Sequence, residues 1–200
     1  MLAQLTATSS LPKTLNAAHL LVLLPKAKIL PSDVPHRELL AAVLKRRGIK
    51  AEEFADKPIA ANAADGSLIA WAMLDFSKTH FAIQTQARKA MQLLLDEHPS
   101  GVTIVVQGDE AQRRQAAEAA VYAAWVNGAP LPLHKKKADQ RKPLQKIALY
   151  GFADTKSFAA LKAQAAGNLL CRTLTVLPPN ELTPALYRKR IKVLAKQNGW

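Results

Sequence analysis

The sequence has a single cysteine and no long hydrophobic run. Cys171 alone cannot form an internal disulfide, which argues against a secreted, disulfide-stapled scaffold. The densest apolar stretch, residues 17–24, is far too short to span a bilayer, and the N-terminus lacks the features of a signal peptide. We therefore expect a cytoplasmic protein with no membrane partner. We also expect Cys171 to be a buried packing thiol in a helix rather than a nucleophile.

Acidic residues are scarce: 15 Asp and Glu stand against 28 Lys and Arg, a net charge of +13. A basic chain is the usual electrostatic footprint of a nucleic-acid binder. However, no helix-turn-helix, zinc-finger or RNA-recognition signature occurs, and no aromatics interleave the main basic run. A solvated turn between strands with only weak DNA binding is the favoured interpretation, and a nucleic-acid patch is the alternative. The candidate patch is Lys135, Lys136, Lys137, Arg141 and Lys142; a second group, Arg188, Lys189, Arg190, Lys192 and Lys196, lies in the last helix.

No pattern of metal ligands or catalytic residues is visible. The histidines are scattered with no pair at the i, i+4 spacing, so surface or capping positions are expected for them. Gly108 lies between a predicted strand and a helix, where free amides could hold an anion. Asp109 and Glu110 at that helix start are more simply explained by the helix dipole. Trp71 and Trp125 are expected in the core or an interface. The histidines are His19, His36, His80, His98 and His134.

Strands and helices alternate along the first 150 residues. This order, with β-branched central runs, predicts an α/β domain with a mixed, mostly parallel sheet flanked by helices. The first 14 residues are polar enough to be loosely ordered. Expected strands are 18–24, 67–74 with a hairpin arm at 60–64, 102–106 (a central strand) and 144–150; expected helices are 35–44 ended by Gly48, 82–97, and 109–125.

The last 46 residues predict two helices joined by a proline turn. Apolar residues at helical spacing indicate a long helix from Asp154 or Thr155, which two consecutive prolines end. Thr183 and Pro184 then start a second helix, with a hydroxyl cap and a proline at the first helical position. No later element covers the apolar stripe of this final helix, Leu186, Tyr187, Ile191 and Leu194. We therefore interpret it as part of a truncated domain, and expect it to pack on another copy or to be loosely ordered.

This C-terminal segment resembles the domain-junction signature of the leucyl aminopeptidases, a helix with Gly-Asn-x-x-x-Arg-x-Leu followed by Pro-Pro-Asn-x-Leu-Thr-Pro. The resemblance implies a macro-like N-terminal α/β domain at 1–152, a connecting helix at 153–177 and the start of a truncated catalytic domain at 178–200. It also implies a hexameric two-metal exopeptidase that removes N-terminal amino acids from peptides. The matching residues are Asn168, Arg172, Pro178, Pro179, Asn180, Thr183 and Pro184.

The metal-binding segments of that family are absent from this sequence. In the family, two divalent ions, zinc or manganese, are held by segments that look like Gly-Lys-Gly-x-x-Phe-Asp-Ser-Gly-Gly and Asn-Thr-Asp-Ala-Glu-Gly-Arg. Neither occurs here, so no catalytic or metal-binding residue is assigned and the chain alone is expected to be inactive. The domain would then serve positioning and oligomer assembly. Some leucyl aminopeptidases also bind DNA, which keeps open the alternative of a basic α/β module for nucleic acid or a nucleotide.

Overall fold

The central element of the computed structural model, which describes residues 2–12, 14–55, 57–132 and 142–199, is one six-stranded sheet. Its strand order is β1-β6-β5-β2-β4-β3. All neighbouring strands are parallel except β3, which runs antiparallel to β4. The predicted mixed, mostly parallel sheet is therefore confirmed. The strands are β1 (Gln4–Thr8), β2 (His19–Pro25), β3 (Ile59–Asn62), β4 (Leu68–Leu74), β5 (Gly101–Val106) and β6 (Lys146–Tyr150).

Helices cover both faces of this sheet and form a separate apolar core on each. On one face, α1 and a short 3-10 helix, Ala51–Ala55, pack over Trp71, which is fully buried. On the other face, α2, α3 and the start of α4 enclose the larger core, which includes Trp125. The expectation that both tryptophans are core residues is confirmed. The helices are α1 (Arg37–Arg47), α2 (His80–Leu95), α3 (Glu110–Asn127), α4 (Thr155–Thr175) and α5 (Pro184–Asn198).

Local side-chain chemistry sets most element boundaries close to the predicted positions. The Thr79 hydroxyl accepts a hydrogen bond from the Ala82 amide and begins α2, and Asp109 forms a capping box with Gln112 at the start of α3. Gly48 ends α1 in the left-handed conformation, with φ 63°. Asp65 accepts bonds from the Ser67 amide and hydroxyl in the turn that joins β3 to β4. The predicted hairpin is therefore confirmed.

The N-terminal segment differs from its prediction. Residues 4–8 are not loosely ordered: they form β1, which pairs in parallel with β6 over five residues. The carbonyl of Ala3 also accepts a hydrogen bond of 2.9 Å from Trp125 Nε1. A five-residue strand whose partner lies about 140 positions away carries no local signal strong enough to separate it from a polar tail, so the prediction failed.

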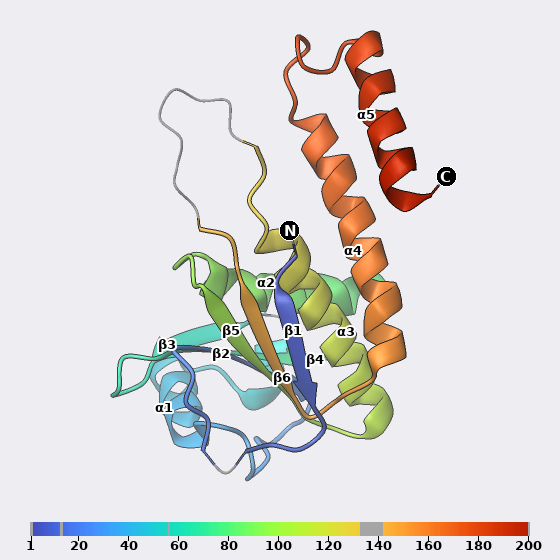
Figure 1. The fold of residues 1–200 in the computed structure, drawn as a ribbon. Coiled ribbons are helices and arrows are strands. Elements are labelled where there is room, and N and C mark those ends of the chain that lie inside the picture. The colour runs from blue at the N-terminus through green and yellow to red at the C-terminus, as the bar shows by residue number, and fades with distance from the viewer. Residues whose placement is uncertain (1, 13, 56, 133–141, 200) are drawn as a thin grey trace.

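Helix α4 extends beyond the domain it packs against, as Figure 1 shows: its second half rises away from the sheet, and α5 follows it in the same arm. Phe158 and Ala165 are buried, whereas Leu170 is 39% exposed. The cysteine prediction is wrong, because Cys171 is exposed, although the next residue, Arg172, is partly buried. We call residues 166–199 the C-terminal arm.

Candidate functional site: the domain junction

The residues that carry the junction signature attach α4 to α3. Asn168 Nδ2 donates a hydrogen bond of 2.9 Å to the Tyr122 hydroxyl, and Arg172 Nη1 donates one of 2.6 Å to the Val126 carbonyl. Tyr122 and Val126 lie one turn apart on α3, as Asn168 and Arg172 do on α4. The two helices are therefore joined by two polar contacts in matching order, one helical turn apart.

The contact made by Arg172 has a clear electrostatic reason. Val126 lies in the last turn of α3, where backbone carbonyls lack an amide partner within the helix. The carbonyl end of a helix also carries partial negative charge, which a guanidinium stabilises. Arg172 thus supplies both a donor and a positive charge to the C-terminus of α3.

A second polar group fixes the beginning of α4. The Ser157 hydroxyl donates to Glu118 Oε1 on α3, and Arg114 Nε donates to the same oxygen at 3.0 Å. The hydrogen bond and the charge of Glu118 raise the pKa of Arg114 above its usual value. The Phe158 ring meets Phe152 edge-on with centroids 5.9 Å apart. These contacts orient α4 at its point of departure from the sheet.

The turn after α4 has the predicted form. Pro178 and Pro179 lie just beyond the helix, and the Pro178 carbonyl accepts bonds from the amides of Glu181 and Leu182 at 2.9 and 3.2 Å. Asn180 lies in this turn and is exposed. Thr183 caps α5 by accepting from the Leu186 amide at 3.4 Å, with Pro184 at the first helical position. The predicted end of α4 and start of α5 are confirmed.

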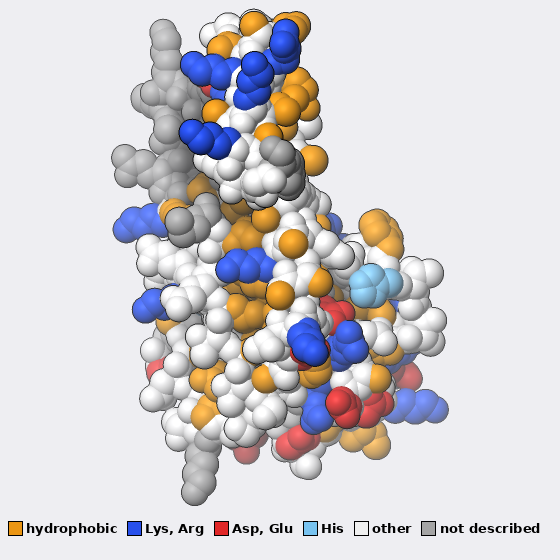
Figure 2. Space-filling view, turned by 45° about the vertical axis from the view of Figure 1, so that its right-hand side comes forward, with side chains coloured by type: hydrophobic (Ala, Val, Ile, Leu, Met, Phe, Trp, Pro, Cys, Tyr) orange, Lys and Arg blue, Asp and Glu red, His pale blue; other side chains and the backbone are white. Residues whose placement is uncertain are grey.

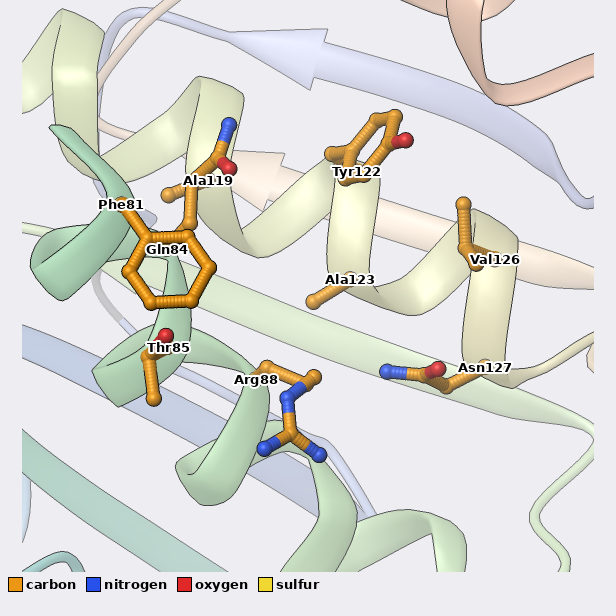
Figure 3. A pocket seen from close by; sticks show the side chains of 9 residues that line it. All are labelled: Phe81, Gln84, Thr85, Arg88, Ala119, Tyr122, Ala123, Val126 and Asn127. Carbon is orange, nitrogen blue, oxygen red and sulfur yellow. The ribbon is translucent and has the colours of Figure 1, made fainter. Parts of the chain in front are cut away.

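A small groove lies beside the junction, between α2 and α3. It has a volume of about 130 Å³. Figure 3 shows the side chains that line it, among them Phe81 and Arg88 of α2 and Tyr122 and Asn127 of α3. The Phe81 side chain is 78% exposed. The lining contains one charged residue, Arg88, and no histidine, cysteine or carboxylate, so it offers contacts but no acid–base pair. This groove was not predicted from the sequence, because no local pattern shows which helices are neighbours.

The structure describes only some of the basic residues singled out in the sequence. Lys135, Lys136, Lys137 and Arg141 lie outside the described residues, and Lys142 is exposed just before β6. The five basic residues of α5 are all exposed, and Figure 2 shows lysine and arginine side chains gathered over the C-terminal arm. Arg190 lies 3.6 Å from Glu181. The second basic group therefore lies on a projecting helix that is open to a partner.

The remaining candidates include the histidines, and His36, His80 and His98 are exposed. His36 precedes α1 in the left-handed conformation, and His19 contacts Glu97 at 2.9 Å; His134 lies outside the described residues. Near Gly108, the capping box at the start of α3 engages the amides of Asp109 and Gln112. Across the described ranges, no three His, Cys, Asp or Glu side chains are grouped so that they could hold a metal ion. None of the described helices is long and apolar enough to cross a membrane.

Two solved structures of other proteins have a fold similar to that of this chain. No family model matches the sequence, and no curated protein matches it. A mutant of tomato leucine aminopeptidase superimposes with a TM-score of 0.73 at 13% identity, over 98% of this chain and 42% of that one. The bottromycin maturation enzyme BotP gives a TM-score of 0.59 at 20% identity, over 92% of this chain and 38% of that one. The chain thus spans about two fifths of either enzyme and has the fold that its resemblance to the leucyl aminopeptidases implies.

Proposed function

We propose that this chain is the N-terminal domain, connecting helix and first catalytic-domain helix of a leucyl-aminopeptidase-like exopeptidase. The observation that carries the proposal is that Asn168 and Arg172, matched to the family signature from sequence, both contact α3 in a fold similar to that of tomato leucine aminopeptidase. The chain's own part is to position the catalytic domain at the far end of α4 and to contribute to an oligomer, which we expect to be a homo-hexamer in the cytoplasm.

The chemistry of the parent enzyme would be supplied by residues other than those described. Two divalent ions would activate a water molecule and polarise the scissile carbonyl of a peptide. The described residues offer no suitable group of donors, so they do not fit a two-metal site. We therefore assign them no step of the reaction. Their part is to hold α4 by its hydrogen bonds to Tyr122 and Val126, which sets the direction in which the chain enters the next domain.

Activity measurements test this division of roles. The pure chain, assayed with zinc or manganese and a leucyl chromogenic substrate, should release no leucine above the metal-free control. A chimaera that joins the chain after α5 to the matching remainder of tomato leucine aminopeptidase should be active, and Arg172→Ala should lower that activity more than Arg188→Ala does. Metal-dependent release of leucine by the chain alone would contradict the proposal.

A second candidate function, nucleic-acid binding, is favoured by the exposed basic residues of α5 and by Lys142. Fluorescence anisotropy with a labelled DNA duplex, measured over a series of salt concentrations, tests it. We expect weak binding that disappears near physiological ionic strength. Neutralising Lys135, Lys136, Lys137, Arg141 and Lys142 should leave folding almost unchanged. Tight binding that survives at that ionic strength, and whose salt slope falls by about one unit for each neutralised phosphate contact, would favour the second function.

A further inference from the structure

Strand β1 is an edge strand of the sheet, and its own sequence lacks the residues that commonly protect such a strand. It lies outermost in the strand order, and its sequence, Gln-Leu-Thr-Ala-Thr, contains no charged residue and no proline. Natural edge strands are commonly blunted by lysine, proline or a bulge, because unpaired backbone groups recruit another strand. The pairing of β1 with β6 is regular over all five residues, so its other edge is straight and suited to pairing.

The backbone of β1 presents two residues at this open edge. The Gln4 amide donates to Gln145 O at 2.8 Å, and the Thr8 carbonyl accepts from the Gly151 amide at 3.0 Å, so both residues face β6. Because backbone groups alternate in direction along a strand, Thr6 also faces β6, whereas Leu5 and Ala7 face the opposite way. The amides and carbonyls of Leu5 and Ala7 are therefore directed to the edge.

A crevice runs along the same edge, between β1 and the first half of α4. Its volume is about 330 Å³. Leu5 and Ala7 line it from β1, and Phe158, Ala159 and Lys162 line it from α4, which lies beside β1 in Figure 1. Leu5 and Ala7 are only half-buried, although both pack against the larger core. A strand added here would place alternate side chains in this apolar crevice.

We propose that β1 pairs antiparallel with β1 of a second copy, with Thr6 on the two-fold axis. This register sets Leu5 of each copy opposite Ala7 of the other. Those pairs exchange both of their backbone hydrogen bonds, four in all. It also sets a large side chain against a small one on the crevice face, and threonine against threonine on the opposite face, which is a favourable cross-strand pair. The five residues are thus complementary to themselves.

The charges beside the crevice favour the same partner. Asp154 lies at the start of α4, beyond the carboxyl end of β6, and Lys162 lies two turns further along α4, toward the amino end of β1. Two-fold pairing brings the Lys162 end of each copy next to the Asp154 end of the other. Such complementarity fixes the register and suppresses wrong pairings. This dimer does not depend on the proposed aminopeptidase activity. Its test therefore measures association of the chain and not catalysis.

Sedimentation equilibrium of the chain over a series of concentrations tests the pairing. We expect a reversible dimer. Thr6→Lys, which sets two like charges on the axis, should weaken association at least about tenfold. The matched control is Asn62→Lys, an equal charge change at an exposed position on β3 at the other edge of the sheet, and it should leave association unchanged. Circular dichroism verifies that both variants are folded.

Cross-linking locates the axis. In a Cys171→Ser background, Thr6→Cys should form an intermolecular disulfide on oxidation. Non-hydrogen-bonded antiparallel pairs lie about 4.5 Å apart at Cα, within disulfide range. Asn62→Cys should not cross-link. A chain that is monomeric throughout, a dimer that survives Thr6→Lys, or a folded dimer in which Thr6→Cys does not cross-link would each overturn the proposal. So would a monomer that binds an extended peptide of another sequence at β1.

Discussion

Replacing Arg172 with alanine should loosen the attachment of α4 and lower the stability of the whole domain. The substitution removes the 2.6 Å hydrogen bond to the Val126 carbonyl and the positive charge at the C-terminus of α3. A hydrogen bond from a charged donor contributes about 1.5–3 kcal/mol, and a favourable charge at a helix end about 0.3–1 kcal/mol. Because Arg172 is only half-buried, water can compensate for part of the lost hydrogen bond and part of the lost charge interaction. We therefore expect a loss of about 1–2 kcal/mol in the free energy of unfolding.

Urea denaturation measures this loss, and hydrogen exchange shows where it acts. The amides in the second half of α4 should lose more protection than those of β5, which report global unfolding. Arg172→Lys keeps the positive charge and N–H donors but not the planar guanidinium, so it should recover part of the loss. The matched control, Arg188→Ala on the exposed face of α5, should change the unfolding free energy by less than about 0.5 kcal/mol. If Arg172→Ala and Arg188→Ala were equal in both measurements, the role of the junction contacts would be refuted.

Three other positions give predictions that thermal or urea unfolding and hydrogen exchange can check. Gly151→Ala should lower the free energy of unfolding by at least about 2 kcal/mol, because Gly151 has φ 100° and an added Cβ would collide with the Val106 carbonyl. An unchanged free energy of unfolding would contradict this prediction. Hydrogen bonds from Ser77 and Lys26 lower the pKa of Asp75 from 3.8 to about 2. Asp75→Asn should therefore lower the free energy of unfolding above pH 3.8, and this difference should disappear as the pH falls through 2. A difference that does not change with pH would contradict the prediction. In a dilute monomer, the amides of α5 should exchange faster than those of β5, because no described residue of α5 is buried; equal protection would contradict this.

The bounds of most helices and of the inner strands could be predicted from sequence because their causes are local. A hydroxyl or carboxylate reaches amides two or three residues away, as Thr79, Asp109 and Thr183 do, and Gly48 needs only its own conformational freedom. Strand β4 is buried at all seven positions, so its continuous apolar composition is itself the signal. The junction signature was recognisable for the same reason, since a proline turn and a capped helix are encoded within a few residues.

Tertiary structure alone decided the features that depend on distant partners. Whether residues 4–8 form a strand depends on β6, and whether Cys171 is buried depends on which side of α4 the domain covers. The contacts of Asn168 and Arg172 join residues 46 positions apart, and the groove near Phe81 exists only because α2 lies beside α3. Periodicity reports that a helix has an apolar face but not what covers it, because the covering surface is brought there by the rest of the chain.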